Sequence, residues 1–161
     1  MSLTQEEAHR LFEYKDGVLI RKLTTSRLGK QGNVAGWKNN TGYQSVSIRG
    51  KQYGVHQIVY LLHHGFIPKL IDHIDNNPQN NSIENLREAN KTENNLNAKI
   101  RTDNTSGCKN VNWHSQKKKW QVRLCINKKS VSFGLFEDLE FADLVAQEAR
   151  SKYFGSFARH H

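Results

Sequence analysis

The sequence predicts an α+β protein built from two small units. Short alternating strand patterns and amphipathic helical patterns are mixed along all 161 residues, with turn residues between them. Apolar residues make up 36% of the chain, a low share that suits small units with thin cores better than one large core. Residues 99–107 (KIRTDNTSG) have the composition of a linker, and they separate a unit at residues 1–98 from a second unit at residues 108–161.

The first unit opens with a predicted helix and two predicted hairpins. Thr4 and Glu7 have the spacing of a capping box and precede residues that share one helical face. The Asp-Gly pair at residues 16–17 lies between two strand-like runs, which is a hairpin signal. A second alternating run surrounds the Arg-Gly pair at residues 49–50 and predicts another hairpin.

A loop and a buried helix complete this part of the chain. Residues 24–42 are rich in Gly, Asn, Ser and Lys, and they indicate an extended basic loop with Trp37 as an anchor. Residues 56–65 (HQIVYLLHHG) predict a short, mostly buried helix that Gly65 and then Pro68 bring to an end.

An asparagine-rich stretch follows at residues 70–97 (LIDHIDNNPQNNSIENLREANKTENNLN). Its composition suits a polar loop, yet apolar residues are threaded through it. We expect a strand, a loop, a short strand and a helix whose cap is Thr92 or Asn90. The expected elements are KLIDHI at 69–74, NPQNNS at 77–82, NLREA at 85–89 and TENNLNAK at 92–99.

The polar residues of this stretch suit phosphodiester hydrolysis. Such a reaction needs a base to activate water, a cation to offset charge on the phosphate, and rigid geometry. Asp72 stands beside His73, and Asn85 and Asn94 follow. Carboxylate and amide oxygens suit Mg²⁺ or Mn²⁺. Neighbouring side chains of a strand point to opposite faces, so Asp72 and His73 share a site only if the strand bends or ends there.

The segment from VHQIVYLLHHG, at residues 55–65, through residues 70–97 resembles the HNH nucleases. Among them it is similar to the phage homing endonucleases in which asparagine replaces the last histidine. The resemblance implies a ββα-metal finger and places His56 at a recurrent position that braces the site. The spacing of 12 residues from His73 to Asn85, and of 9 more to Asn94, fits that pattern.

The resemblance also implies a role for each matched residue. His73 matches the general base, and Asp72 matches a metal ligand. Asn85 matches the middle asparagine, whose side chain ties the loop down and orients the histidine. Asn94 matches the second metal ligand on the helix, so that Asp72 and Asn94 hold one ion, with Asn95 as the alternative in register. The implied cofactor is one divalent ion, Mg²⁺ or else Mn²⁺.

Three strands and one helix are predicted for the second unit. Residues 109–114, 119–127 and 130–136 read as strands, and residues 138–155 read as a helix that Asp138 caps. The middle strand alternates cleanly, so we expect the helix to cover one face and leave the other exposed. The inward set is Trp120, Val122, Leu124 and Ile126, and the outward set includes Gln121 and Arg123. The helix carries an apolar stripe of Leu139, Ala142, Val145, Ala146, Ala149 and Tyr153, and Gly155 is the expected stop.

Residues 105–155 resemble the Apetala/ethylene-response-factor type of DNA-binding domain, through SGCKNVNWH, KWQVRL and VSFGLFEDLEFADLVAQEA. That family lays its three-stranded sheet in the major groove, with the helix behind. The implied DNA contacts are Lys109, Asn112, His114, Lys117, Lys119, Arg123, Lys128 and Lys129, the last two with phosphates. Asn112, Arg123 and Ser132 depart from the usual arginine, acidic residue and aromatic at their positions, so the family's usual target sequence does not carry over.

Charge and cysteine content limit the classes of function. The net charge is +9 and the pI is near 9.7, which favours nucleic acid as the partner over a merely solvated basic surface. Cys108 and Cys125 are too few for a disulfide framework or a thiolate zinc site. With no signal peptide and no long apolar run, we expect free thiols and a cytoplasmic protein. The resemblance to phage homing endonucleases implies a phage-infected bacterial host.

The leading hypothesis is therefore a metal-dependent, site-preferring and homing-like DNA endonuclease that acts on double-stranded DNA. One active site per chain predicts a nick from a monomer, and a double-strand break from a dimer or two events. No obligatory protein partner is expected beyond a weak dimer. The first alternative is a DNA-binding regulator with an inactive finger. The third hypothesis is an RNA-binding basic protein, although the chain lacks an aromatic stacking platform.

Overall fold

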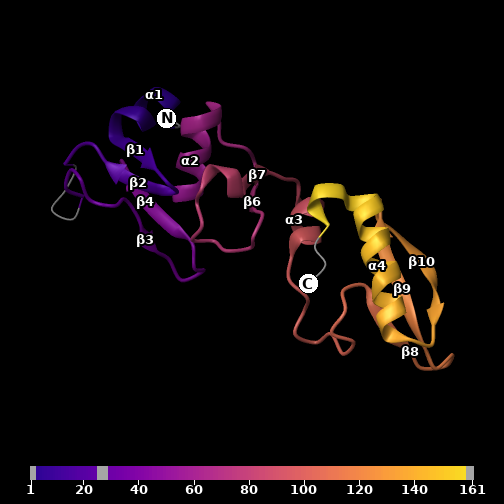
Figure 1. The fold of residues 1–161 in the computed structure, drawn as a ribbon. Coiled ribbons are helices and arrows are strands. Elements are labelled where there is room, and N and C mark those ends of the chain that lie inside the picture. The colour runs from indigo at the N-terminus through magenta and orange to yellow at the C-terminus, as the bar shows by residue number, and fades with distance from the viewer. Residues whose placement is uncertain (1–2, 25–28, 159–161) are drawn as a thin grey trace. The chain divides into compact units, whose positions relative to one another are not determined.

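The computed structural model describes residues 3–24 and 29–158 and confirms the α+β class. The chain divides into two compact units, Met1–Lys91 and Thr92–His161, and each unit contains both helices and strands (Figure 1). The division falls ahead of residues 99–107, where we expected a linker. Both cysteines are free, as expected. No helix in the described parts of the chain is both long and apolar enough to span a bilayer.

The first unit contains three small antiparallel sheets within its described residues, with strand orders β1-β2, β3-β4-β5 and β6-β7. Its elements are α1 (Gln5–Leu11), β1 (Phe12–Lys15), β2 (Val18–Arg21), β3 (Trp37–Lys38), β4 (Gln44–Ile48), β5 (Lys51–Gly54), α2 (Val55–His64), β6 (Ile71–His73), the 3-10 turn η1 (Ile83–Asn85) and β7 (Leu86–Glu88).

Local chemistry explains where these first elements begin and turn. The side chain of Thr4 accepts a hydrogen bond from the backbone N–H of Glu7 and caps α1, as its spacing predicts. Both predicted hairpins are present, joining β1 to β2 and β4 to β5. Their turns place both central residues at positive φ, 47° and 81° at residues 16–17 and 50° and 77° at residues 49–50.

Helix α2 is the buried centre of the first unit. Its residues Ile58 and Val59 are fully buried, and they pack in one core with Ala8 of α1, Leu19 of β2 and Val46 of β4. Gly65, in the left-handed conformation with φ 81°, ends the helix as predicted. Because α2 follows β5 directly, packing in this core fixes the start of α2 against the sheet β3-β4-β5.

The interpretation of Trp37 as an anchor is wrong. Trp37 begins the two-residue strand β3, and its side chain is 44% exposed. The predicted basic loop at residues 24–42 is therefore interrupted by a strand paired with β4. Residues 25–28 of that loop lie outside the described residues.

The second unit is a three-stranded antiparallel sheet with order β10-β9-β8 and a helix packed on one face. Its elements are β8 (Val111–His114), β9 (Lys119–Ile126), β10 (Lys129–Phe136), α4 (Leu139–Phe154) and the 3-10 turn η2 (Gly155–Phe157). Helix α3 (Lys91–Asn97) begins at the last residue of the first unit, one residue before the predicted start at Thr92. Figure 1 shows α4 lying along the strands of this sheet.

Alanines bring α4 close to the sheet. Ala142, Ala146 and Ala149 are buried against Val122 and Leu124, which confirms the predicted inward face of the middle strand. Since alanine has no side chain beyond Cβ, the helix axis lies near the strands. The outward face carries Asn112, Gln121 and Arg123, because Asn112 pairs with Gln121 and alternates with buried Val111.

The predicted stripe of α4 is wrong at its last turn. Tyr153 is 47% exposed, whereas Arg150 is 1% exposed and occupies the inward side of that turn. The guanidinium of Arg150 donates a hydrogen bond to the backbone carbonyl of Lys109, which lets a charged group replace an apolar one there. Asp138 caps the helix and Gly155 ends it, as predicted.

Candidate active site

A hairpin with a long connecting loop carries the predicted catalytic residues of the first unit. Strand β6 pairs with β7, so that Asp72 lies opposite Arg87 and His73 lies opposite Leu86. The loop between them runs from residue 74 to residue 85 and ends in η1. Asp72 and His73 are both buried. His73 is the last residue of its strand, which meets the condition for the two neighbours to share one site.

Asn85 lies at the base of this loop and binds both of its sides. Its Oδ1 accepts the backbone N–H of Asp75 at 3.0 Å. Its Nδ2 donates to Asp75 Oδ1 at 2.9 Å and to the carbonyl of Asn80 at 2.8 Å. The backbone of Asn85 also accepts the N–H of Ile74 at 2.9 Å. One buried amide therefore closes the loop next to His73.

The acidic residue Asp75 lies inside this hydrogen-bonded loop. Partial burial acts to raise the pKa of Asp75, but hydrogen bonds from the Asn77 backbone and from the Asn80 and Asn85 side chains outweigh it, so the pKa is lower than usual. The carboxylate is accordingly a fixed acceptor of the loop. Asn77 continues the series by accepting the N–H of Gln79 at 3.1 Å.

His73 is held by an asparagine that the sequence did not single out. Its Nε2 lies 3.3 Å from Oδ1 of Asn81, whose side chain is 1% exposed. Nδ2 of Asn81 donates to the carbonyl of Gln79 at 3.3 Å and to Oε1 of Gln44 at 3.1 Å. Because a carbonyl only accepts, the amide oxygen faces the histidine, and Nε2 carries the proton. Nδ1 is then the basic nitrogen of the neutral ring.

A second histidine packs against the first. The ring of His56, on α2, lies 5.3 Å from the ring of His73 in a T-shaped arrangement, and Tyr43 lies within 5.8 Å of both. Among the described residues, His56 Nδ1 is buried and has no hydrogen-bond partner. Burial, and secondarily the charge of protonated His73, lower the pKa of His56 from 6.5 to about 4. His56 is therefore neutral at physiological pH.

A glycine makes room for the His56 ring. A Cβ atom on Gly54 would lie 2.5 Å from Cε1 of His56, much closer than two carbons approach. Gly54 is the residue before α2, and its N–H donates to Oε1 of Gln57 at 2.9 Å. The ring of His56 therefore folds back over the start of its own helix, toward His73.

The predicted metal ligand Asp72 is paired with an arginine. Nε and Nη2 of Arg87 lie 2.8 and 2.7 Å from the same carboxylate oxygen, Oδ2. The Arg87 side chain is 16% exposed, so Arg87 is neither a freely solvated residue nor one that extends into water to meet a phosphate. The pair neutralises the buried carboxylate and fixes its orientation.

The two predicted ligands carry the kinds of oxygen that a hard divalent cation binds. Asp72 offers a carboxylate oxygen and Asn94 an amide oxygen, and Mg²⁺ binds few protein oxygens while keeping several waters. In the described parts of the chain, no three His, Cys, Asp or Glu side chains gather where they would hold a metal. The predicted pair is not such a group, because one of its two members is an amide.

Asn94 lies on α3, in the second unit. Its side chain is half-buried, whereas that of Asn95 is exposed. Asn95 lines a groove of the second unit, together with Lys99 and Asn112. Neighbouring residues of a helix point about 100° apart, so Asn94 points in a different direction from Asn95. Its pairing with Asp72 stays a prediction.

The predicted DNA contacts lie mostly on the outward face and the turns of the second unit. Asn112 and Arg123 are exposed on that face, and His114 pairs with Lys119 at its end. The remaining predicted contacts in the turns and at the hairpin end are Lys117, Lys128 and Lys129. Lys109 is the exception, because its amine donates to the carbonyls of Leu96 and Ala98 at 2.6 Å each and holds the end of α3.

Known proteins resemble this chain in the part that carries the hairpin. The HNH endonuclease family matches residues 53–96, which span α2, β6, β7 and most of α3. Protein 3.8 of Escherichia phage T7 is 37% identical over 97 residues, which cover 59% of this chain and 79% of that protein. The chain belongs to the HNH endonuclease family. No solved structure matches it. The family match ends at residue 96, within α3, and does not reach the sheet of the second unit.

Proposed function

We propose that the protein is a metal-dependent DNA endonuclease that hydrolyses phosphodiester bonds. The observation that carries this proposal is a buried histidine, held in one tautomer by Asn81 and followed by a loop that Asn85 closes, inside the part of the chain that matches the HNH endonucleases. A buried, oriented imidazole beside a buried carboxylate is an arrangement that activates water.

In this proposal His73 is the general base. Its Nε2–H is held by Asn81, so Nδ1 takes the proton from the attacking water. His56 stays neutral next to it, because burial lowers the pKa of His56 to about 4. Asn85 keeps the loop closed so that the His73 backbone does not shift.

Asp72 and Asn94 would hold the divalent ion, Mg²⁺ or Mn²⁺. When bound, such an ion offsets the charge that develops on the phosphoryl oxygens and on the leaving oxygen. Arg87 holds Asp72 through one carboxylate oxygen, Oδ2, and so sets the direction of the other oxygen, Oδ1. This role for Arg87 is positioning, because it acts through Asp72.

The second unit would supply affinity and sequence preference, as in a homing endonuclease. Its outward sheet face, with Asn112, Gln121 and Arg123, has the polar side chains that read base edges in a major groove. Lys128 and Lys129, at the hairpin end, would contact phosphates. Joining the two units in one chain raises the effective concentration of the nuclease at the bound site. The resemblance of residues 105–155 to the Apetala/ethylene-response-factor domains is part of this proposal.

We further propose that the enzyme nicks one strand of double-stranded DNA when it acts as a monomer, and that a double-strand break requires a dimer or two events. A phage protein is among its relatives, which supports action inside an infected bacterial cell. The competing function is a DNA-binding regulator whose finger does not cut. The two differ in whether the covalent backbone is broken.

Incubation of a supercoiled plasmid with Mg²⁺ tests the function. The nuclease converts the plasmid to open circles with Mg²⁺ and leaves it intact with EDTA. A regulator binds and retards the plasmid under both conditions without relaxing it. Intact plasmid at all Mg²⁺ and Mn²⁺ concentrations, despite binding, would contradict the proposal.

The ligand assignment has its own test and control. Asn94→Ala is expected to raise the Mg²⁺ concentration needed for half-maximal nicking, because one oxygen ligand is lost. Asn95→Ala is the matched neighbour and is expected to leave that concentration unchanged. The reverse result would assign the second metal ligand to Asn95 instead of Asn94.

A further inference from the structure

A basic groove runs between the segment after α3 and the edge of the sheet in the second unit. Its volume is about 680 Å³. Lys99 and Arg101 line one side, and Asn110, Asn112 and Arg123 line the other. All of these residues belong to the second unit. The groove therefore includes part of the segment whose composition indicates a linker.

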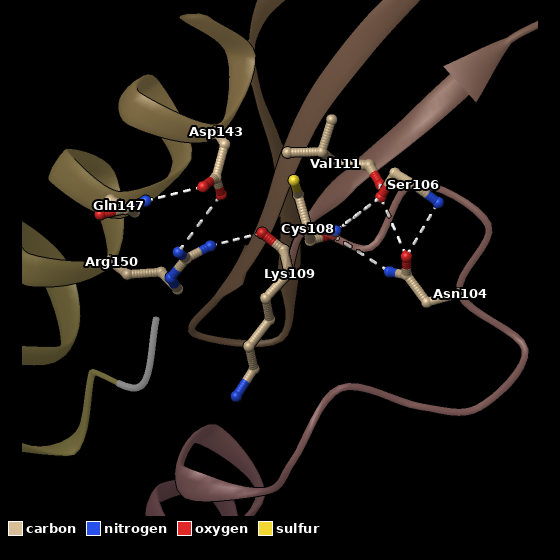
Figure 2. A network of polar contacts seen from close by, with 8 residues as sticks. All are labelled: Asn104, Ser106, Cys108, Lys109, Val111, Asp143, Gln147 and Arg150. Carbon is tan, nitrogen blue, oxygen red and sulfur yellow. Dashed lines mark hydrogen bonds and ion pairs between the residues drawn. The ribbon is translucent and has the colours of Figure 1, made fainter. Parts of the chain in front are cut away.

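A network of short-range hydrogen bonds makes one wall of the groove rigid. Figure 2 shows Asn104 and Ser106 beside Cys108 and Val111, with dashed lines joining them. Oδ1 of Asn104 accepts the N–H groups of Ser106 and Gly107 at 3.0 and 2.8 Å, and its Nδ2 donates to the carbonyl of Cys108 at 3.1 Å. Ser106 Oγ donates to the carbonyl of Val111 at 2.7 Å. Residues 104–111 are thus tied to the first strand of the sheet.

A buried arginine fixes the same wall from behind. Arg150 donates to the carbonyl of Lys109, and its guanidinium lies 3.8 Å from the carboxylate of Asp143 (Figure 2). Asp143 in turn accepts from Gln147 Nε2 at 2.7 Å. A buried guanidinium is costly unless it is paired, so any shift of the backbone at Lys109 would leave a buried donor unsatisfied.

Lys109 joins the two walls. Its backbone is held by Arg150, and its amine donates to the carbonyls of Leu96 and Ala98. Ala98 immediately precedes Lys99, so the tether sets where the opposite wall begins. These contacts restrain the separation of the two walls in the free protein, so less backbone freedom is lost when a ligand binds.

The charge of the lining selects an anion. Lys99, Arg101, Lys109 and Arg123 contribute four positive charges, and Asp103 is the acidic residue of the lining. Arg101 Nε and Nη2 donate to the two carboxylate oxygens of Asp103 at 2.9 Å each, so these two charges offset each other and the lining keeps a net charge of +3. The lining asparagines add amide donors. These groups match the spaced phosphate oxygens of a nucleic-acid backbone better than a metal ion or an apolar ligand.

The groove opens onto the outward face of the sheet. Asn112 and Arg123 belong to both surfaces, and the backbone N–H of Arg123 donates to the carbonyl of Asn110 at 3.0 Å. This face is opposite to the one that α4 covers. A duplex lying on the outward face would therefore continue past the β8 edge and into the groove.

We propose that this groove binds the sugar–phosphate backbone of duplex DNA, with Lys99 and Arg101 as phosphate contacts. The inference rests on the proposed function for the identity of the ligand. It assigns a binding role to the segment 99–103, which lies outside the region of Apetala/ethylene-response-factor resemblance. The segment would thereby align the end of α3 with the DNA that the sheet reads.

Binding of a short labelled DNA duplex by the full chain, measured over a range of salt concentrations, tests the proposal. The double variant Lys99→Ala/Arg101→Ala is expected to lower the slope of log K against log salt by about 2, because each lost phosphate contact removes about 0.9. The charge-conserving double variant Lys99→Arg/Arg101→Lys is expected to keep the slope. Lys152→Ala, on the exposed side of α4, is the control outside the groove.

The outcomes separate this inference from the proposed function. An unchanged slope in Lys99→Ala/Arg101→Ala, with plasmid nicking intact, would overturn the groove while leaving the nuclease standing. No binding of duplex by the wild type would overturn both. Displacement of the duplex from the wild type by inorganic phosphate, at equal ionic strength, would also overturn the assignment to DNA. So would a larger change of the salt slope in the double variant for an RNA duplex than for a DNA duplex.

Discussion

His73 owes its tautomer to side chains from distant parts of the sequence. Asn81 holds the ring nitrogen, and Gln44 on β4 holds Asn81 at a separation of 37 residues. Tyr43, directly before β4, and His56, on α2, pack against the ring. The histidine is thus oriented by the core of the first unit as well as by its own loop, which is what a base in a fixed position requires.

The residue spacing predicts only part of this site. Asp72, His73 and Asn85 fall in one hairpin, as their distances along the chain indicate. Asn81 was not separable from the neighbouring asparagines, because its distinguishing feature is burial against a residue of another sheet. The pairing of Arg87 with Asp72 follows from strand register, which a single sequence does not reveal.

Asn85→Ala should destabilise the first unit. The variant loses three hydrogen bonds from a buried side chain, and about 2–3 kcal/mol of the free energy of unfolding should go with them. Urea denaturation, followed by circular dichroism, measures the change. Asn77→Ala, which loses one exposed bond, should cost well under about 1 kcal/mol, and equal losses in the two variants would count against a special role for Asn85.

His56 should make the stability of the first unit depend on pH. Its pKa is about 4 in the folded chain and 6.5 as a free side chain, so the unfolded chain binds more protons between these values. The part of the free energy of unfolding that is linked to His56 should therefore be fully present above pH 6.5. It should fall as the pH drops toward 4, by about 3 kcal/mol at most. Urea midpoints across this range measure the effect. His56→Gln should remove this part of the dependence, and an unchanged pH profile in that variant would show that other groups cause it.

At the scale of elements, the helix caps and tight turns were the most predictable features. Thr4, Asp138 and the two hairpin turns act through neighbours within a few residues, so the local sequence contains the cause. The segment 99–107 was less predictable. Asn, Ser and Gly make flexible linkers and also make ordered turns, and the Asn104 network shows that here they make an ordered turn.

The start of α2 offers a test of how β5 and the helix position His56. Gly54→Ala should push the His56 ring away from His73, because the added Cβ would overlap Cε1. We expect about a tenfold loss of nicking rate from the misplaced ring. In the His56→Ala background the ring is absent, so Gly54→Ala should cost little more. The double-mutant cycle measures this coupling, and additive losses would mean that Gly54 acts through the backbone instead.

At the scale of the whole molecule, the two units differ in how they place their polar residues. The first unit buries its polar site residues among hydrogen bonds, whereas the second unit exposes its polar and basic residues on an open sheet face. Composition and periodicity predict the α+β class and the two units, because each unit contains both alternating strand patterns and amphipathic helix patterns. They do not predict that Lys109 and Arg150 are structural, because their contacts join residues 13 and 41 positions apart.

Lys128→Ala combined with Lys129→Ala should weaken DNA binding by a similar factor on all sequences. Both residues lie at the β9–β10 turn, and phosphates are the same on every sequence. The salt dependence of log K should also fall by about 2. Titration of several unrelated duplexes at matched salt measures both quantities. A loss limited to one sequence would mean that these lysines contact bases.

The nicking rate of His73→Ala tests the catalytic role of the buried histidine most directly. The measurement is the rate of conversion of supercoiled plasmid to open circles in Mg²⁺, at protein concentrations that saturate DNA binding. His9→Ala, an exposed histidine on α1, is the matched control and should keep the wild-type rate. His73→Ala should be slower by about 100- to 10,000-fold, with DNA binding unchanged, because the proton acceptor is gone. A His73→Ala protein that nicks as fast as the wild type would contradict the assignment of His73 as the base.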